Sequence, residues 1–90
     1  MSQNYPNPFN PTTSIKFSVP QASVVTITVY DILGREVTTL VNGNYVAGFY
    51  TVPFNASNLA SGVYLYRMNS RSLVAGQKLF VDTKKLMLLK

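Results

Sequence analysis

The chain has 90 residues, 47% of them hydrophobic, so it can form one folded domain with a single core and is too short for two. It contains no cysteine and no histidine, which excludes disulfides, thiolate metal sites and the usual general base near neutral pH. Eight basic residues against three acidic ones give a net charge of +5, and because the basic residues are scattered we expect them to provide solubility rather than to bind nucleic acid.

The first segment of the chain is rich in proline. Residues 4–12 place a proline at every second or third position, which fixes φ and removes backbone donors. We therefore expect an extended segment along a sheet edge or across a sheet face, with Tyr5 and Phe9 as apolar anchors. A plain interdomain linker is the alternative. These features divide the chain into a linker or edge segment at residues 1–12 and a folded domain at residues 13–90.

Two strands follow, each indicated by alternating apolar and polar residues. Residues 14–19 alternate strictly, and residues 25–29 alternate again after a turn at residues 20–23. The next residues predict a tight turn, because Asp31 can accept hydrogen bonds from the backbone amides ahead of it and Gly34 can adopt a positive φ.

A hairpin signal stands in the middle of the chain. After a strand at residues 36–41, the dipeptide Asn42-Gly43 lies between two apolar segments and is the strongest short hairpin signal in the sequence. We expect the chain to reverse there. A further strand is expected at residues 50–54, where Pro53 favours an edge position.

The remaining residues predict a central strand and a tail. Residues 63–68 are apolar on both faces until Arg67, as in a central strand covered from both sides. Two further strand segments are expected, one around residues 73–81 and one at residues 84–90.

The last of these segments is apolar on both of its faces. Leu86 and Leu88 point one way and Met87 and Leu89 the other, so a half-buried strand leaves one apolar pair facing outward, as at a partner surface. Coverage of both faces by other segments is the alternative. Three lysines flank the pair and keep the edge soluble: Lys84, Lys85 and Lys90.

Short strands with frequent turns, and no convincing helix, predict an all-β fold. The pattern is typical of an antiparallel β-sandwich of about seven strands. Its core should contain the in-phase residues of the strands, which are Ile15, Phe17, Val25, Ile27, Val29, Tyr50, Val52, Phe54, Tyr64 and Tyr66.

Candidate chemistry is sparse. Without histidine, a serine nucleophile would need a buried lysine as its base. A paired-carboxylate site would require Asp82 to fold back against Asp31 and Glu36. Alternate aromatics at Tyr64 and Tyr66 are more typical of a core than of a stacking platform for sugar or single-stranded nucleic acid. We therefore expect no enzyme activity, no cofactor and no metal site.

The sequence indicates neither a membrane-spanning segment nor an N-terminal signal peptide. The longest apolar run, residues 86–89, has four residues and cannot span a bilayer. The start of the chain has neither the basic residues nor the apolar run of a signal peptide. We therefore expect no transmembrane segment, and a chain that either stays inside the cell or has been cut from a longer one. For a secreted protein, the alternatives are a fragment or an atypical stand-alone protein.

Four motifs in order carry a resemblance to a known family. They are Tyr5–Pro11 (YPNPFNP), Val29–Val37 (VYDILGREV), Leu59–Arg67 (LASGVYLYR) and Thr83–Lys90 (TKKLMLLK). Together they resemble the type A C-terminal sorting domain of the Bacteroidetes type IX secretion system over essentially the whole chain. The immunoglobulin-like module of the flagellar hook-cap protein shares part of the pattern.

The resemblance implies a function in protein export. It implies an immunoglobulin-like sandwich at the C-terminus of a secreted or cell-surface protein, which the outer-membrane translocon recognises after Sec export and a sortase-like protease removes. Carried over by motif, the residues that would contact the translocon are Gly34, Arg35, Lys84, Lys85, Leu86, Met87, Leu88, Leu89 and Lys90. The junction with the cargo would lie at Tyr5, Pro6, Asn7, Pro8 and Phe9.

A structural role is the alternative. In a self-assembling subunit, the proline-rich segment or the apolar last strand would complete the sheet of a neighbouring copy by strand addition. A sorting signal should be monomeric, whereas a donor-strand subunit should polymerise.

Overall fold

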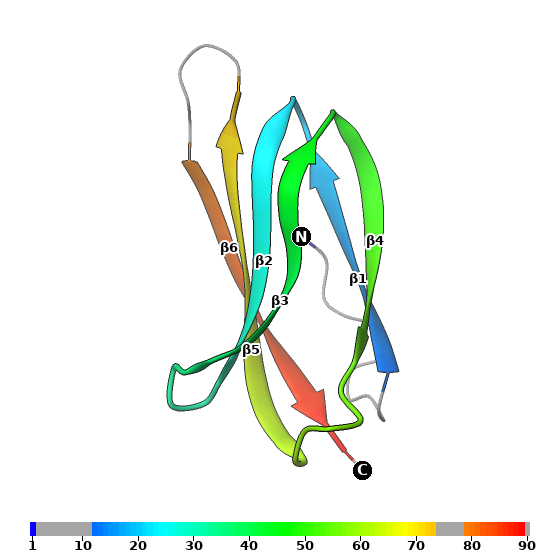
Figure 1. Cartoon of the computed structure of the whole chain (residues 1–90), viewed down its shortest axis with the longest axis vertical. Coiled ribbons are helices and arrows are strands. Elements are labelled where there is room, and N and C mark those ends of the chain that lie inside the picture. Colours follow the sequence, from blue (N-terminus) through cyan, green and yellow to red (C-terminus); the bar gives the residue numbers. More distant parts are fainter. Residues whose placement is uncertain (2–11, 74–78, 90) are drawn as a thin grey trace.

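The chain folds into two antiparallel β-sheets (Figure 1). The computed structural model describes residue 1, residues 12–73 and residues 79–89, so the expectations for the proline-rich segment and for Lys90 lie outside the described residues. The strands are β1 (Thr12–Val19), β2 (Ser23–Asp31), β3 (Glu36–Tyr45), β4 (Gly48–Asn55), β5 (Gly62–Ser72) and β6 (Leu79–Leu88). One sheet has the order β1-β4 and the other the order β3-β2-β5-β6. The prediction of an all-β, immunoglobulin-like antiparallel sandwich is confirmed, with six strands among the described residues where about seven were expected.

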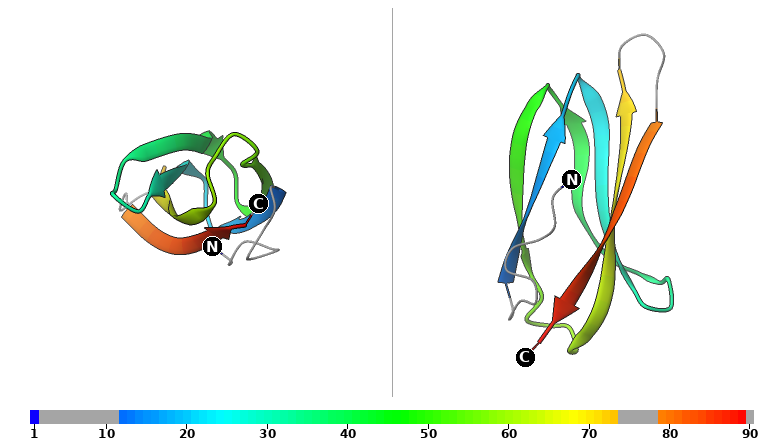
Figure 2. Two further views of the ribbon diagram at one scale, coloured as in Figure 1. Left: turned by 90° about the horizontal axis from the view of Figure 1, so that it is seen from below. Right: turned by 180° about the vertical axis from the view of Figure 1, so that it is seen from behind.

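A single core lies between the two sheets, which enclose it when the molecule is viewed along its long axis (Figure 2). Its buried hydrophobic residues are Ile15, Phe17, Val19, Val25, Ile27, Val29, Val41, Phe54, Ala56, Tyr64, Tyr66, Met68, Leu86 and Leu88. Of the predicted core residues, only Tyr50 and Val52 are half-buried, and they pack against the core from its margin. Both lie on β4, which among the described residues pairs only with β1 and so has one edge without a neighbouring strand.

An aromatic cluster joins the two sheets where the chain passes from one to the other. The Tyr50 ring stacks on Phe17 at 5.3 Å between centroids and meets the edge of Tyr45 at 4.8 Å. The Phe17 and Tyr45 rings are 5.6 Å apart. Because these rings come from β1, β3 and β4, they hold the crossing from β3 to β4 in place.

The prediction of a turn at Asn42-Gly43 is wrong. Both residues lie inside β3, with Asn42 opposite Thr26 and Gly43 opposite Val25 of β2. The chain leaves β3 only after Tyr45 and then enters the other sheet. Pairing β3 along nearly all of β2 satisfies more backbone groups than a two-residue reversal would, and this outweighs the local preference of the dipeptide.

The end of the chain forms a long hairpin rather than two short segments. β5 lies between β2 and β6, which confirms its central position. Its inner face is buried, but on its outer face Val63 and Leu65 are half-buried and Arg67 is exposed, so the expected cover from both sides is not found among the described residues. The β5–β6 ladder runs from Gly62 opposite Leu88 to Arg71 opposite Leu79.

Two phenylalanines of β4 test the phase of the strands. We expect Phe54→Ala to lower the free energy of unfolding by about 3–5 kcal/mol, because Phe54 is 4% exposed and its removal leaves a cavity. Phe49→Ala is the matched control, since Phe49 is 92% exposed and should change stability by less than about 0.5 kcal/mol. Chemical denaturation measures both, and equal effects would contradict the assignment of faces.

Candidate recognition site

The turn between β2 and β3 is held by hydrogen bonds to one aspartate. Asp31 Oδ1 accepts from the amides of Leu33 and Arg35, each at 2.9 Å. The Gly34 amide donates to the Asp31 carbonyl at 3.0 Å, and the Asp31 amide donates to the Arg35 carbonyl at 2.9 Å. Gly34 has φ +85°, which confirms the turn predicted from the sequence.

Arg35 is exposed but is tied to the same aspartate. Its Nε donates to Asp31 Oδ2 at 2.7 Å, while 75% of the side chain is exposed. The Arg35 backbone amide lowers the pKa of the Asp31 carboxyl, an effect that desolvation partly opposes and that the Arg35 side chain and the Leu33 amide reinforce. Arg35 therefore stabilises the turn in addition to presenting charge.

The tail residues divide between core and surface. Leu86 and Leu88 are 0% and 1% exposed, whereas Met87 and Leu89 are 42% and 54% exposed. Lys85 is exposed and Lys84 half-buried. The predicted alternation is thus confirmed, and among the described tail residues the more exposed side is the one that carries Lys85, Met87 and Leu89.

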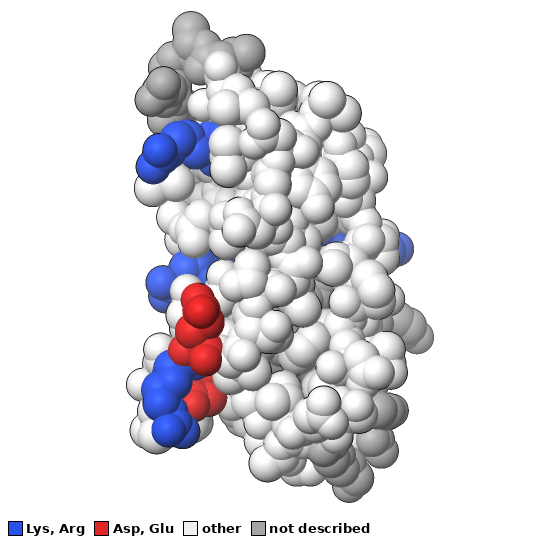
Figure 3. Space-filling model, in the orientation of Figure 1, with Lys and Arg blue, Asp and Glu red and all other residues white. Residues whose placement is uncertain are grey.

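The outer face of the β5–β6 pair extends this exposed side along the whole strand. Across the ladder, Arg71 stands opposite Leu79 and Leu65 opposite Lys85. Arg67 lies 5.3 Å from the centre of the Tyr30 ring. The face therefore mixes apolar and basic side chains. Figure 3 shows basic side chains at several levels on the left of the molecule, the lowest of them beside acidic side chains.

Sequence reasoning missed the first half of this surface. Leu79 and Val81 are 60% and 50% exposed and continue the outward series of Met87 and Leu89 at a period of two residues. The sequence carries no clear signal for this, because residues 79–81 and 86–89 are apolar at every position and residues 82–85 are polar at every position, so neither face stands out.

The turn and the tail lie at the same end of the sandwich. Asp31 stands opposite Tyr64, and Tyr64 stands opposite Leu86, so the two candidate sites are separated by one strand of the sheet. Neighbouring strands are about 4.8 Å apart, which places the β2 and β6 backbones about 10 Å apart at this level. The structure thus brings together two motifs that are far apart in the sequence.

The acidic residues do not form a catalytic pair. Asp82 stands opposite Met68, which stands opposite Ile27, so it lies several residues along the sheet from the Asp31 turn. Its Oδ2 is 3.3 Å from the Met1 amino group. Among the described residues, no group of histidine, cysteine, aspartate or glutamate side chains is arranged to hold a metal ion.

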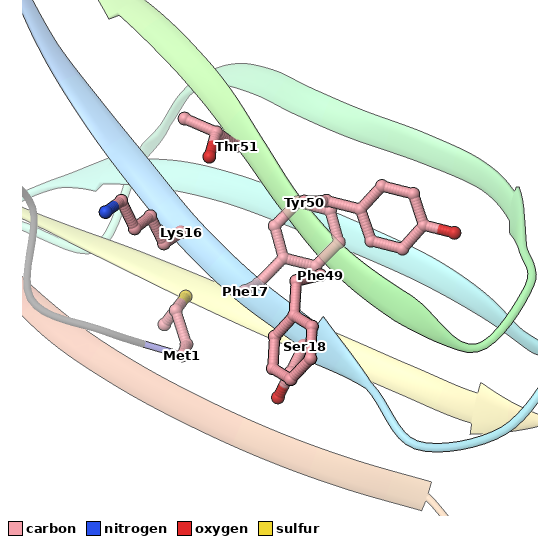
Figure 4. A pocket seen from close by; sticks show the side chains of 7 residues that line it. All are labelled: Met1, Lys16, Phe17, Ser18, Phe49, Tyr50 and Thr51. Atoms are coloured by element: carbon pink, nitrogen blue, oxygen red, sulfur yellow. The ribbon is translucent and has the colours of Figure 1, made fainter.

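A groove beside β1 and β4 has a volume of about 380 Å³. Its lining residues are Met1, Lys16, Phe17, Ser18, Phe49, Tyr50 and Thr51 (Figure 4). The Tyr50 hydroxyl is engaged, since it donates to the Val46 carbonyl at 2.7 Å. The described residues of the lining combine one lysine with a methionine and with aromatic and hydroxyl side chains, and none of them carries a carboxylate that could form an acid–base pair with the lysine.

Residues 3–82 match the family described as secretion system C-terminal sorting domain. The chain belongs to this family. Searches among curated proteins and among solved structures found no match. Family membership supports a C-terminal sorting signal for type IX secretion and implies a secreted or cell-surface protein. In the described part of the sorting domain, no helix has the length and apolarity needed to traverse a bilayer.

Two glycines of the sorting domain test the turn geometry. We expect Gly34→Ala to lower the free energy of unfolding by about 1–2 kcal/mol, because a side chain at positive φ is strained even where space is open. Gly43→Ala is the control, since Gly43 lies in β3 with open space around it, and it should leave stability unchanged or raise it by at most about 1 kcal/mol. Thermal or urea denaturation of both variants measures the difference, and equal losses would contradict a special role for Gly34.

The Asp31 carboxylate makes the turn sensitive to acid. Because its pKa is lowered in the folded state, it contributes stability that is present above its unfolded pKa and is lost as the pH falls through the folded pKa. Urea denaturation from about pH 6 to about pH 2 should show this loss, and Asp31→Asn should remove that part of the pH dependence. An unchanged acid profile in the Asn variant would show that the carboxylate is not responsible.

Proposed function

We propose that the domain is a non-catalytic signal that the type IX outer-membrane translocon recognises in its folded form, through the outward side of β6. One observation supports this most directly. Leu86 and Leu88 anchor the strand in the core, while Met87 and Leu89 on the opposite side remain exposed next to Lys85. A partner can therefore contact the tail without unfolding it.

The composition of this side suits a protein partner. Apolar side chains at the centre of an interface supply most of its binding free energy, and exposed apolar groups on a strand are otherwise an aggregation hazard. The neighbouring basic residues reduce self-association and attract an acidic receptor surface. The acidic partner surface is thus part of the proposal.

The proposal also covers the junction between the domain and its cargo. We place the junction with the cargo at residues 5–9, which precede β1, and assign removal of the domain to a sortase-like protease that acts on this junction. The catalytic residues then belong to the protease, and the domain needs no active site of its own.

A second candidate function has one observation in its favour. Among the described residues, β6 pairs only with β5 and β1 only with β4, so each leaves one edge open to strand addition from another copy. Size-exclusion chromatography with light scattering distinguishes the two proposals. A monomer at high concentration supports the sorting signal, and concentration-dependent polymers support the assembly subunit.

The outward side of β6 can be tested without removing the strand. Deleting residues 84–90 would also remove Leu86 and Leu88 from the core, so substitutions are the sharper test. In a type IX-competent host, a Sec-exported reporter fused to the domain with Met87→Ser and Leu89→Ser should accumulate in the periplasm, with secretion lowered about tenfold or more.

The matched control replaces two exposed apolar residues elsewhere. Val46 and Phe49 are 71% and 92% exposed at the far end of the sandwich, and the Val46→Ser and Phe49→Ser variant should be secreted normally. Circular dichroism and denaturation establish that each variant is folded. Normal secretion of the folded β6 variant would contradict this recognition site.

A further inference from the structure

The tip of the β2–β3 turn carries two exposed apolar side chains. Ile32 and Leu33 are 74% and 76% exposed, more than Met87 or Leu89 of the tail. The turn projects beyond the body of the sandwich (Figures 1 and 2). A projecting turn needs no apolar residue for folding, because its own hydrogen bonds define its shape.

Hydrogen bonds within the turn fix the backbone conformation of this tip. Asp31 Oδ1 accepts from the Leu33 and Arg35 amides, and the amides of Asp31 and Gly34 close the turn with backbone bonds. Binding through Ile32 and Leu33 would therefore immobilise little more than the two side chains. Such preorganisation is the main physical condition for a small contact to bind strongly.

The charges around the tip indicate the kind of surface that it fits. Asp31 and Arg35 neutralise each other at 2.7 Å, and Glu36 is exposed next to them. The formal charges of residues 31–36 are −1, +1 and −1, which sum to −1, whereas the whole chain carries +5. Two apolar side chains are too few for stable membrane attachment, so a protein pocket is the more suitable partner for this tip.

We propose that Ile32 and Leu33 form a preformed apolar knob that inserts into an apolar pocket of a folded protein, with basic or hydrogen-bond donor groups at the pocket rim facing Glu36. Arg35 acts as a positioning residue, because its contact with Asp31 fixes the turn. The knob and the outward side of β6 lie at one end of the sandwich, so a single partner can contact both. The inference rests on the proposed function only in naming export as the process that uses the knob.

The test replaces both knob residues and keeps the residues that build the turn. The Ile32→Ser and Leu33→Ser variant should retain the denaturation midpoint of the unchanged domain and lower secretion of the fused reporter about tenfold or more in the type IX-competent host. The Val46→Ser and Phe49→Ser variant is the control and should be secreted normally. Normal secretion of the folded knob variant would overturn the proposal.

Photo-crosslinking tests whether the knob contacts a protein, independently of secretion. The photoreactive residue p-benzoylphenylalanine, placed at position 33 or at position 49, is irradiated in the host cells. We expect one defined protein adduct at position 33 and none at position 49, with the adduct suppressed by excess unchanged domain but not by excess knob variant. If the unchanged fusion is not secreted, the proposed function fails, and this competition alone supports or overturns the knob.

Lipid vesicles test the alternative that the knob binds a membrane surface instead of a protein. Sedimentation with vesicles of phosphatidylethanolamine and phosphatidylglycerol should leave both the unchanged domain and the knob variant in the supernatant. Binding of the unchanged domain alone would assign the knob to a lipid surface and overturn the protein pocket.

Discussion

The burial of alternating side chains between two sheets of unequal width is the constraint on which the structure depends. Among the described residues, β1 and β4 form a two-stranded sheet and β3, β2, β5 and β6 a four-stranded sheet. At one end of β6 the inward side chains Leu86 and Leu88 are buried, whereas Phe80, which is in phase with them, is 54% exposed. The tail of the chain is thus the anchored part of its strand, and its position depends on the core rather than on any local signal.

Because side chains alternate along a strand, the residues that pack in the core are separate from the residues that a partner can contact. On β6, one side of the strand supplies core residues and the other supplies an exposed apolar and basic series. The β2–β3 turn achieves the same separation by different means, because backbone and carboxylate hydrogen bonds hold the loop while Ile32 and Leu33 face solvent. In both places the exposed side chains lie outside the core, so we expect that they can be substituted without unfolding the domain.

The family match and the structure support different parts of the functional argument. The match covers residues 3–82 and ends within β6, before Lys84 and Lys85. Membership therefore rests on the residues up to the middle of the last strand. The position of the tail in the fold is supported by the β5–β6 ladder, which continues to Leu88 opposite Gly62. It is also supported by the alternation of buried and exposed side chains along the tail.

The sequence by itself determined the class of fold, the faces of most strands and the turn at Asp31 and Gly34. These follow from a period of two residues and from local backbone preferences, both of which act within a few positions of the chain. Only the tertiary structure decided that Asn42 and Gly43 lie within a strand, that residues 79–88 form one strand, and that the turn and the tail meet at one end. Period and propensity state which way a side chain points, but they do not state which strand pairs with which, because pairing satisfies backbone groups over the whole length of a ladder and can outweigh a local turn.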